Sequence, residues 1–387
     1  MTQRRYIDVH ILQTVPPANL NRDDQGNPKE AYFGGVRRSR VSSQAWKRAT
    51  RLAFAERGID ELDLGTRTKK IAAELTNLLL DRTALEEEAA ARLAGALLGT
   101  LEIKAGKKAG DTAYLLFYGH RQLEEVAKLV ADRAEELAAL DDAELAAAVK
   151  DLPVKDAFGT GHPVDVALFG RMVADIATLK VDAATQVAHA VSTHATELEF
   201  DYYTAVDDQN PEGETGAGMI GTIGFNSATL YRFATIGLHQ LQDNLGGDHE
   251  TALQAVELFV SSFARSMPSG YTNSFAHRTL PHLVAVVVRD DQPVNLVSAF
   301  ENPVTTGNGS RAAGGIATTS ARRLAREQTT ATSTWGDTPA FTGLCCTLDA
   351  DDETTTSALT DAFGQPRSFP QLVADLRTHL AERGENN

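Results

Sequence analysis

A long helix-patterned stretch interrupts segments that have the pattern of β-strands, and this arrangement constrains the fold more than any other feature. Residues 66–100 and 121–150 are rich in Ala, Leu, Glu and Arg, and their apolar side chains recur at helical spacing, as in Val126, Leu129 and Val130. A strand-like pattern precedes this stretch and returns after it. The sequence therefore predicts a helical insertion within a sheet-forming domain.

The strand-like segments lie on both sides of the insertion. Residues 6–12 alternate between apolar and polar side chains, which predicts a strand that ends at the Pro16-Pro17 pair. Residues 219–233 again have the composition of a strand. The continuous apolar run of residues 283–288 predicts a central strand that is covered on both faces.

Two further helices are predicted among these strands. Ser43 can cap a helix that runs to Arg57, and Gly58 follows where a left-handed residue commonly ends a helix. Residues 250–265 place their apolar side chains on one helical face. The order strand, helix, insertion, strands, helix, strand predicts an α+β fold, a modified ferredoxin-like (RNA-recognition-motif) sheet with a helical elaboration.

The distribution of charge matters more than its total. The chain has 387 residues and a net charge of −15, which by itself argues against a nucleic-acid partner. Residues 1–51, however, contain ten Lys or Arg against four acids, so that this segment carries +6 and the remainder −21. A second stretch, residues 302–326, contains Arg311, Arg322, Arg323 and Arg326 and no acid, and is predicted to be a mobile basic loop.

The predicted helix after Ser42 carries the most informative pattern. Gln44, Lys47, Arg48 and Arg51 stand at i, i+3, i+4 and i+7, so they share one helical face. A polyanion can lie along such a face, where the helix N-terminus and the Ser42 hydroxyl add hydrogen-bond donors. The alternative is the solvated basic face of an ordinary amphipathic helix.

A polar, turn-rich segment at residues 207–216 lies between two strand-like segments and predicts the tip of a protruding hairpin. Tyr202 and Tyr203 stand near its base. Because neighbouring strand residues point to opposite faces, core packing explains only one of these two tyrosines. Exposed aromatic rings near a charged groove can stack on unpaired bases.

Two other motifs suggest different chemistry. Asp23 and Asp24 could hold a divalent metal for RNA cleavage, but no further ligand or general base is recognisable, and a turn in which Asp bonds to backbone amides is favoured. Residues 216–221 match the dinucleotide fingerprint G-x-G-x-x-G. The context is wrong, because a strand-like segment rather than a helix follows. We therefore expect no catalytic residue, no metal site and no cofactor.

Composition limits the location of the protein. No apolar run approaches the roughly 18 to 20 residues that a membrane span needs. The only cysteines, Cys345 and Cys346, are adjacent, which neither staples a fold nor spaces metal ligands. We expect a cytoplasmic protein without a membrane partner.

Several strings together resemble one family, the CasC (Cse four) backbone subunits of type I-E CRISPR Cascade complexes. These strings are residues 20–24, 33–44, 167–172, 201–208 and 226–232. The resemblance implies a palm at residues 1–62, 183–199 and 226–387, helical fingers at residues 63–182, and a hairpin thumb at residues 200–225. It also implies copies that stack into a helical filament along the crRNA, which then pairs with target DNA in antiviral defence, with CasA, CasB, CasD and CasE as further partners.

The resemblance also implies roles for particular residues. Contacts to guide phosphates are implied for Ser42, Gln44, Lys47 and Arg48, with Arg22 and Lys29 nearby, and Arg51 shares their face. Contacts to a displaced base are implied for Tyr202, Tyr203, Thr204 and Val206, and Met172 reaches in from the fingers. In that family target cleavage falls to a separately recruited helicase-nuclease, whereas the alternative is a ribonuclease that cuts at Asp23 or Asp24.

Overall fold

An antiparallel nine-stranded sheet forms the centre of the molecule in the computed structural model, which describes residues 4–103, 106, 108, 110–173, 176, 179–206, 217–305, 315–348 and 352–382. The strands run in the order β11-β10-β1-β9-β7-β3-β2, and β6 and β8 also pair with β9. Their bounds are β1 Tyr6–Ala18, β2 Glu30–Phe33, β3 Val36–Val41, β6 Thr185–Val187, β7 Ala190–Ser192, β8 Glu199–Val206, β9 Ala217–Gly237, β10 Leu283–Arg289 and β11 Phe341–Cys346.

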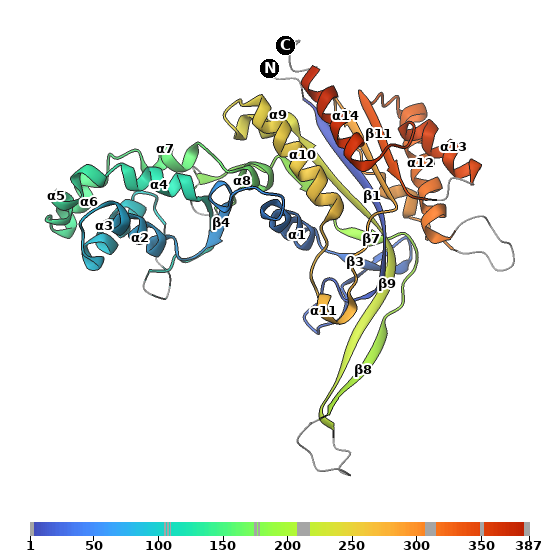
Figure 1. Cartoon of the computed structure of the whole chain (residues 1–387), viewed down its shortest axis with the longest axis horizontal. Coiled ribbons are helices and arrows are strands. Elements are labelled where there is room, and N and C mark those ends of the chain that lie inside the picture. Colours follow the sequence, from blue (N-terminus) through green and yellow to red (C-terminus); the bar gives the residue numbers. More distant parts are fainter. Residues whose placement is uncertain are drawn as a thin grey trace.

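Helices cover both faces of this sheet (Figure 1). On one face lie α1 Ser43–Ala55, α8 Val164–Phe169, α9 Leu238–Asn244, α10 His249–Arg265 and α14 Phe369–Glu382. On the other lie α12 Ile316–Trp335 and α13 Glu353–Phe363, and the short α11 Thr272–Phe275 lies in the loop before β10. The central strands β1 and β10 are buried on both faces, as predicted for residues 283–288.

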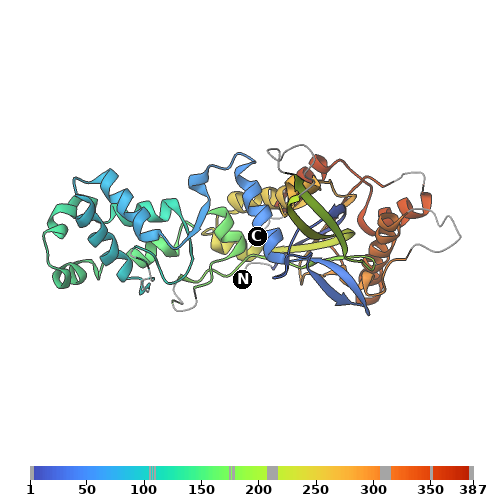
Figure 2. The ribbon, with the colours of Figure 1, turned by 90° about the horizontal axis from the view of Figure 1, so that it is seen from below.

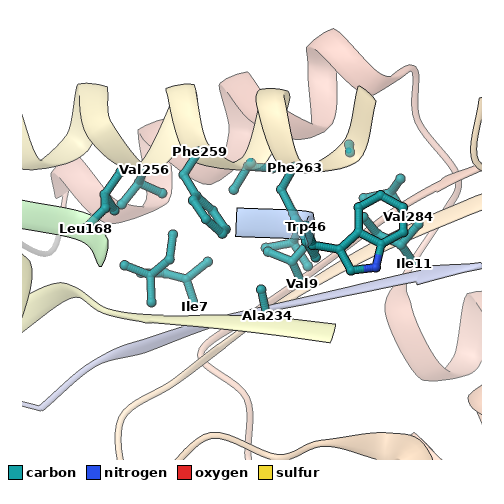
Figure 3. Packing of buried hydrophobic residues seen from close by; sticks show 14 of the residues in the cluster. Ile7, Val9, Ile11, Trp46, Leu168, Ala234, Val256, Phe259, Phe263 and Val284 are labelled. Carbon is teal, nitrogen blue, oxygen red and sulfur yellow. The ribbon is translucent and has the colours of Figure 1, made fainter. Parts of the chain in front are cut away.

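The first of these two cores explains the sequence pattern of β1. Ile7, Val9 and Ile11 point to the same side and pack under α10, where Phe259 and Phe263 stack with ring centroids 5.5 Å apart (Figure 3). The alternating residues of β1 face the α12 side of the sheet. The strand was predicted to end at Pro16, and this is wrong, because it continues to Ala18 through a shift in its register with β9. Such an irregularity tolerates residues that lack a backbone N–H.

The insertion has a core of its own, built from side chains of residues 71–179 (Figure 2, left). Its elements are β4 Gly65–Thr68, α2 Ile71–Arg82, α3 Glu87–Gly99, β5 Leu116–Gly119, α4 His120–Lys128, α5 Ala134–Ala138, α6 Asp142–Val149 and α7 Val154–Gly159. The predicted helices at residues 66–100 and 121–150 are thus confirmed, although β4 and β5 add a small two-stranded sheet that the helical pattern did not reveal. Short 3-10 helices in the described part of the chain include Glu61–Asp63, Ala131–Arg133 and Leu296–Phe300.

A long two-stranded hairpin projects from the sheet (Figure 1). It consists of β8 and the first half of β9, which is 21 residues long in all, and the second half of β9 runs on into the central sheet. The strands predicted on both sides of the polar tip are therefore confirmed, and residues 207–216 lie outside the described residues. Residues 217–221 belong to a strand, which rules out the strand-turn-helix context of a dinucleotide fingerprint.

The basic stretch at residues 302–326 was predicted to be a loop, and this is wrong for residues 316–326, which form the start of α12. Arg322, Arg323 and Arg326 lie in α12, because Ala321, Leu324, Ala325 and Gln328 recur at helical spacing and are buried against the sheet. Arg311 lies outside the described residues. No helix in the described part of the chain is long and apolar enough to span a membrane.

Candidate nucleic-acid interface

Helix α1 presents its polar side chains to solvent because its apolar side is anchored in the core. Trp46, Thr50 and Phe54 recur every fourth residue and are buried, and the Trp46 ring packs edge-on against Phe263 of α10. Gln44 and Arg48 are exposed, whereas Lys47 and Arg51 are half-buried. The shared polar face predicted from the spacing is therefore present in the structure.

Ser42, rather than the predicted Ser43, caps this helix. Its side-chain oxygen accepts a hydrogen bond from the backbone N–H of Ala45 at 3.3 Å, and its own N–H donates to Asn21 Oδ1 at 2.9 Å. Gly58 has a φ of 85°, as expected for a left-handed residue that follows a helix. The Ser42 hydroxyl still has its proton to donate, because capping uses only the oxygen.

One side of the polar face turns toward the insertion. Arg51 Nη1 lies 3.7 Å from Asp165 Oδ2 of α8 and donates to the backbone oxygen of Gly65 at 3.3 Å. The guanidinium groups of Arg51 and Arg67 lie 5.1 and 4.8 Å from the centroid of the Phe117 ring in β5. Arg67 is exposed on β4, so the insertion adds a cation to those of α1.

Electrostatics in this cluster reflect an excess of positive charge. Burial and the nearby charge of Arg67 lower the pKa of Lys47. Burial also lowers the pKa of Arg51, while Asp165 opposes that change. Burial raises the pKa of Asp165 to about 6, although the N–H of Gly65 and the charge of Arg51 act in the opposite direction. A bound phosphate would compensate the positive charge that this single buried carboxyl leaves unbalanced.

The other side of the polar face borders a groove of about 920 Å³. Arg48 lines it from α1, and Arg22 lines it from the loop after β1. The guanidinium of Arg22 stacks on the ring of Tyr271, 4.7 Å from the centroid. Arg22 and Arg48, two predicted phosphate contacts that are 26 positions apart in the sequence, thus line the same groove.

The loop that carries Asp23 and Asp24 is a closed turn. Asp23 Oδ1 accepts backbone N–H groups from Gln25 and Asn27, each at 2.9 Å, which confirms the turn interpretation of this residue. Asp24 is exposed and lines, with Lys29, an open hollow of about 520 Å³ beside the groove. Among the described residues, no group of three or more His, Cys, Asp or Glu side chains is placed to hold a metal ion.

The hairpin displays aromatic side chains on both of its faces. Tyr202 is 63% and Tyr203 43% exposed, so both rings reach solvent, whereas core packing was expected to account for one of them. The Tyr203 ring lies over Gly221 of β9, where an added Cβ would stand 2.4 Å from it. Thr204 is exposed between them and the tip, and Val206 ends β8 with a side chain outside the described residues.

Met172 stands apart from the other predicted contacts. It follows α8 after Gly170, whose φ of 74° ends the helix, and its side chain is 87% exposed. Its neighbour Arg171 is buried and donates to the backbone oxygens of Leu179 and Phe158. This arrangement turns the methionine outward, as a contact to a partner requires.

Several residues of this interface escaped the sequence reasoning. They are Arg57, Arg67, Arg265, Tyr271 and Arg278. Arg265, Tyr271 and Arg278 stand apart from any cluster of basic residues, and Arg67, although Lys69 and Lys70 follow it, lies in the predicted helical insertion. Only the fold shows that these four residues belong near α1. A local signal existed for Arg57 alone, which is the last residue of the predicted helix that carries Arg51.

Comparison with known proteins places the chain in a family. The sequence model of the CT1975-like protein family matches residues 7–375. A solved structure described as "CRISPR RNA-guided surveillance complex, pre-nicking" contains a chain with 30% identity and a TM-score of 0.83, covering 97% of this chain and 100% of that one. Another, described as "CRISPR RNA-guided surveillance complex", has 26% identity and a TM-score of 0.71 over 96% and 99%.

No curated protein matches the sequence. The family match nevertheless spans nearly the whole chain, and both similar structures align with it from end to end. The resemblance to the CasC backbone subunits of Cascade is thereby confirmed. This chain belongs to the CT1975-like protein family.

Proposed function

We propose that this chain is the non-catalytic crRNA-binding backbone subunit of a type I-E CRISPR surveillance complex. Copies of it polymerise along the guide RNA and present it for pairing with target DNA. The observation that carries the proposal is the cationic cluster of Lys47, Arg51 and Arg67 beside Asp165, with Arg48 on the same helix. It occurs in a family whose solved relatives are parts of RNA-guided surveillance complexes.

The cluster is suited to a phosphate backbone rather than to bases. Guanidinium and ammonium groups at a helix face neutralise phosphates whatever the sequence, and the N-terminal amides of α1 add donors beside Ser42. The bases of a strand held in this way remain free to pair. Protein then reads the backbone and base pairing reads the sequence, as in other RNA-guided systems.

The hairpin suits a separate task. Tyr202 and Tyr203 expose rings on a ribbon that projects from the sheet, and such rings can wedge beside an unpaired base. Each copy in a filament would then displace one base with Tyr202, Tyr203, Thr204 and Val206, and Met172 would reach the strand from the insertion. In this proposal the central sheet is a ferredoxin-like palm, the insertion the fingers and the hairpin the thumb.

A salt titration tests the phosphate grip. The purified chain is titrated with a fluorescent single-stranded poly-U RNA at several salt concentrations, and the slope of log K against log salt is measured. Lys47→Ala should flatten the slope by about 0.7, the value for one lost contact to a single strand. The same substitution should weaken binding to RNAs of unrelated sequence by equal factors. A loss confined to one sequence would contradict the proposal.

The chain's own catalytic activity is a second question. In the proposal there is none, and the turn formed by Asp23 supports this, because one carboxylate oxygen is already occupied by two backbone amides. The assembled complex is incubated with matching single-stranded RNA and Mg²⁺. Regularly spaced cuts in the RNA that disappear in Asp23→Ala or Asp24→Ala would show that the subunit is a ribonuclease and not only a scaffold.

A further inference from the structure

The groove beside α1 contains more positive charge than the predicted contacts account for. Its volume is about 920 Å³, and it is lined by five arginines: Arg22, Arg48, Arg57, Arg265 and Arg278. Among the described residues, the only acids on its wall are Asp23 and Glu56. Within the described part of the chain, none of the five arginines forms an ion pair with a carboxylate.

Three of these guanidinium groups are held in place by the protein. Arg57 donates to the backbone oxygen of Ser261 at 3.2 Å, and Arg265 lies over the ring of Phe369 at 5.3 Å. Arg22 lies over Tyr271, as described above. Burial lowers the pKa of Arg57, and so does the like charge of Arg265, because two neighbouring cations repel each other, while Glu56 acts in the opposite direction. An anion placed between them would relieve this repulsion.

The far wall of the groove has a constrained backbone. Tyr271 and Ala276 flank α11 with φ of 49° and 44°, a region that residues other than glycine rarely adopt. Gly270 approaches the end of β1 so closely that a Cβ would stand 2.4 Å from the oxygen of Asn19. Thr279 fastens the end of this loop by donating to the oxygen of Thr14 at 2.7 Å. Local strain that the surrounding structure enforces is typical of binding sites.

We propose that this groove is a second phosphate-binding site for single-stranded RNA, so that one strand contacts both flanks of α1. The inference rests on the proposed function and extends it to Arg57, Arg265 and Arg278, with Tyr271 positioning Arg22. Arg48 belongs to the groove, and Lys47 beside it belongs to the cluster at the insertion, so a continuous strand meets both. Arginine forks bind phosphate oxygens in pairs, which suits a groove rich in unpaired guanidinium groups.

The competing occupant is an acidic protein segment. Residues 207–216 contain Asp207, Asp208, Glu212 and Glu214 and no cation, and they follow the end of the hairpin that points away from the sheet. A second copy of the chain could offer this segment. RNA is favoured because the groove adjoins the cationic face of α1, whereas nothing in the described residues brings a second hairpin there.

Arg278 offers the sharpest test, because its exposed side chain makes no contact that a substitution would break in the described structure. The full chain is titrated with single-stranded poly-U RNA as above. Arg278→Gln should flatten the salt slope by about 0.7, and Arg265→Gln with Arg278→Gln by about 1.4. The matched control is Arg326→Gln, an exposed arginine of α12 on the opposite face of the sheet, which should leave the slope unchanged.

The outcomes separate this inference from the proposed function. If Lys47→Ala flattens the slope and the groove variants do not, the groove site is wrong and the function stands. If none of them changes the slope, both fail. If Arg265→Glu with Arg278→Glu blocks assembly of copies and Asp207→Arg with Asp208→Arg restores it, the acidic segment is the occupant and the RNA site is overturned. Thermal unfolding of each variant verifies that it is folded.

Discussion

Arg51 of α1 lies 3.7 Å from Asp165 of α8, and this contact connects the cationic helix with the base of the insertion. Asp165 is fully buried and also accepts the N–H of Gly65 at 2.8 Å, so that it ties together α8, α1 and the start of β4. Arg51, which shares the helical face of the predicted phosphate contacts, therefore has a structural partner as well. Lys47, one turn earlier, forms no ion pair among the described residues.

The raised pKa of Asp165 predicts a pH-dependent stability. Between about pH 4 and 6 the folded chain keeps a proton on this carboxyl that the unfolded chain has released, so its contribution to stability falls as pH rises through that window. The shift from 3.8 to about 6 corresponds to about 3 kcal/mol. Asp165→Asn carries no titrating proton. As the pH rises from 4 to 7, the stability of the variant relative to that of the native chain should therefore increase by about 3 kcal/mol.

Urea unfolding at a series of pH values measures this difference. Asp8, whose pKa burial likewise raises to about 6, is unchanged in both proteins and cancels in the comparison. A free-energy difference that stays constant across the pH range would show that Asp165 does not titrate in this window.

Arg51 and Lys47 should respond differently to removal. Arg51→Ala leaves the buried Asp165 without its cation and should destabilise the fold by about 1 to 3 kcal/mol at neutral pH. Lys47→Ala should change stability by less than about 0.5 kcal/mol. Denaturant titration measures both. In the Asp165→Asn background Arg51→Ala should cost less, because the uncompensated charge is gone, and equal costs in the two backgrounds would exclude this coupling.

The hairpin tyrosines should contribute to RNA affinity without contributing to its salt dependence. Tyr202→Ala and Tyr203→Ala should each cost about 1 to 3 kcal/mol of binding to the guide for a lost base stack, with an unchanged salt slope. Fluorescence anisotropy at two salt concentrations measures both quantities. Tyr32→Ala, at an exposed tyrosine of β2 rather than of the hairpin, is the control, and an equal loss there would argue for nonspecific aromatic contact.

Arg232 should be a structural residue, unlike the exposed arginines of the groove. It is buried, its guanidinium lies 3.7 Å from the Trp46 ring centroid, and it donates to Gln13 Oε1 and to the backbone oxygen of Phe263. Arg232→Ala leaves two buried acceptors without donors and opens a cavity under α1, so it should destabilise the fold by about 3 to 5 kcal/mol. Thermal unfolding measures this loss of stability. A loss smaller than that caused by Arg326→Ala, at an exposed arginine, would contradict the structural role.

The sequence by itself determined the elements whose cause is local. The spacing of Gln44, Lys47, Arg48 and Arg51 sets a polar helical face wherever that helix lies, and the apolar run of residues 283–288 requires cover on both sides. The family followed from short strings spread along the chain. The period of a strand determined that the two hairpin tyrosines point to opposite faces of β8, so that core packing could account for only one of them.

Only the tertiary structure decided what surrounds that helix. Arg67 reaches α1 because the insertion returns to the sheet through α8, and Arg265 reaches it because α10 packs against α1. Arg278 reaches it because β10, which follows it, pairs with β1 across more than half of the sequence. Residues 316–326 form a helix because the sheet offers a surface for Ala321 and Leu324 to cover, although the composition is that of a loop. Periodicity fixes which side of a helix is polar, whereas the neighbours of that side depend on contacts between residues far apart in the chain.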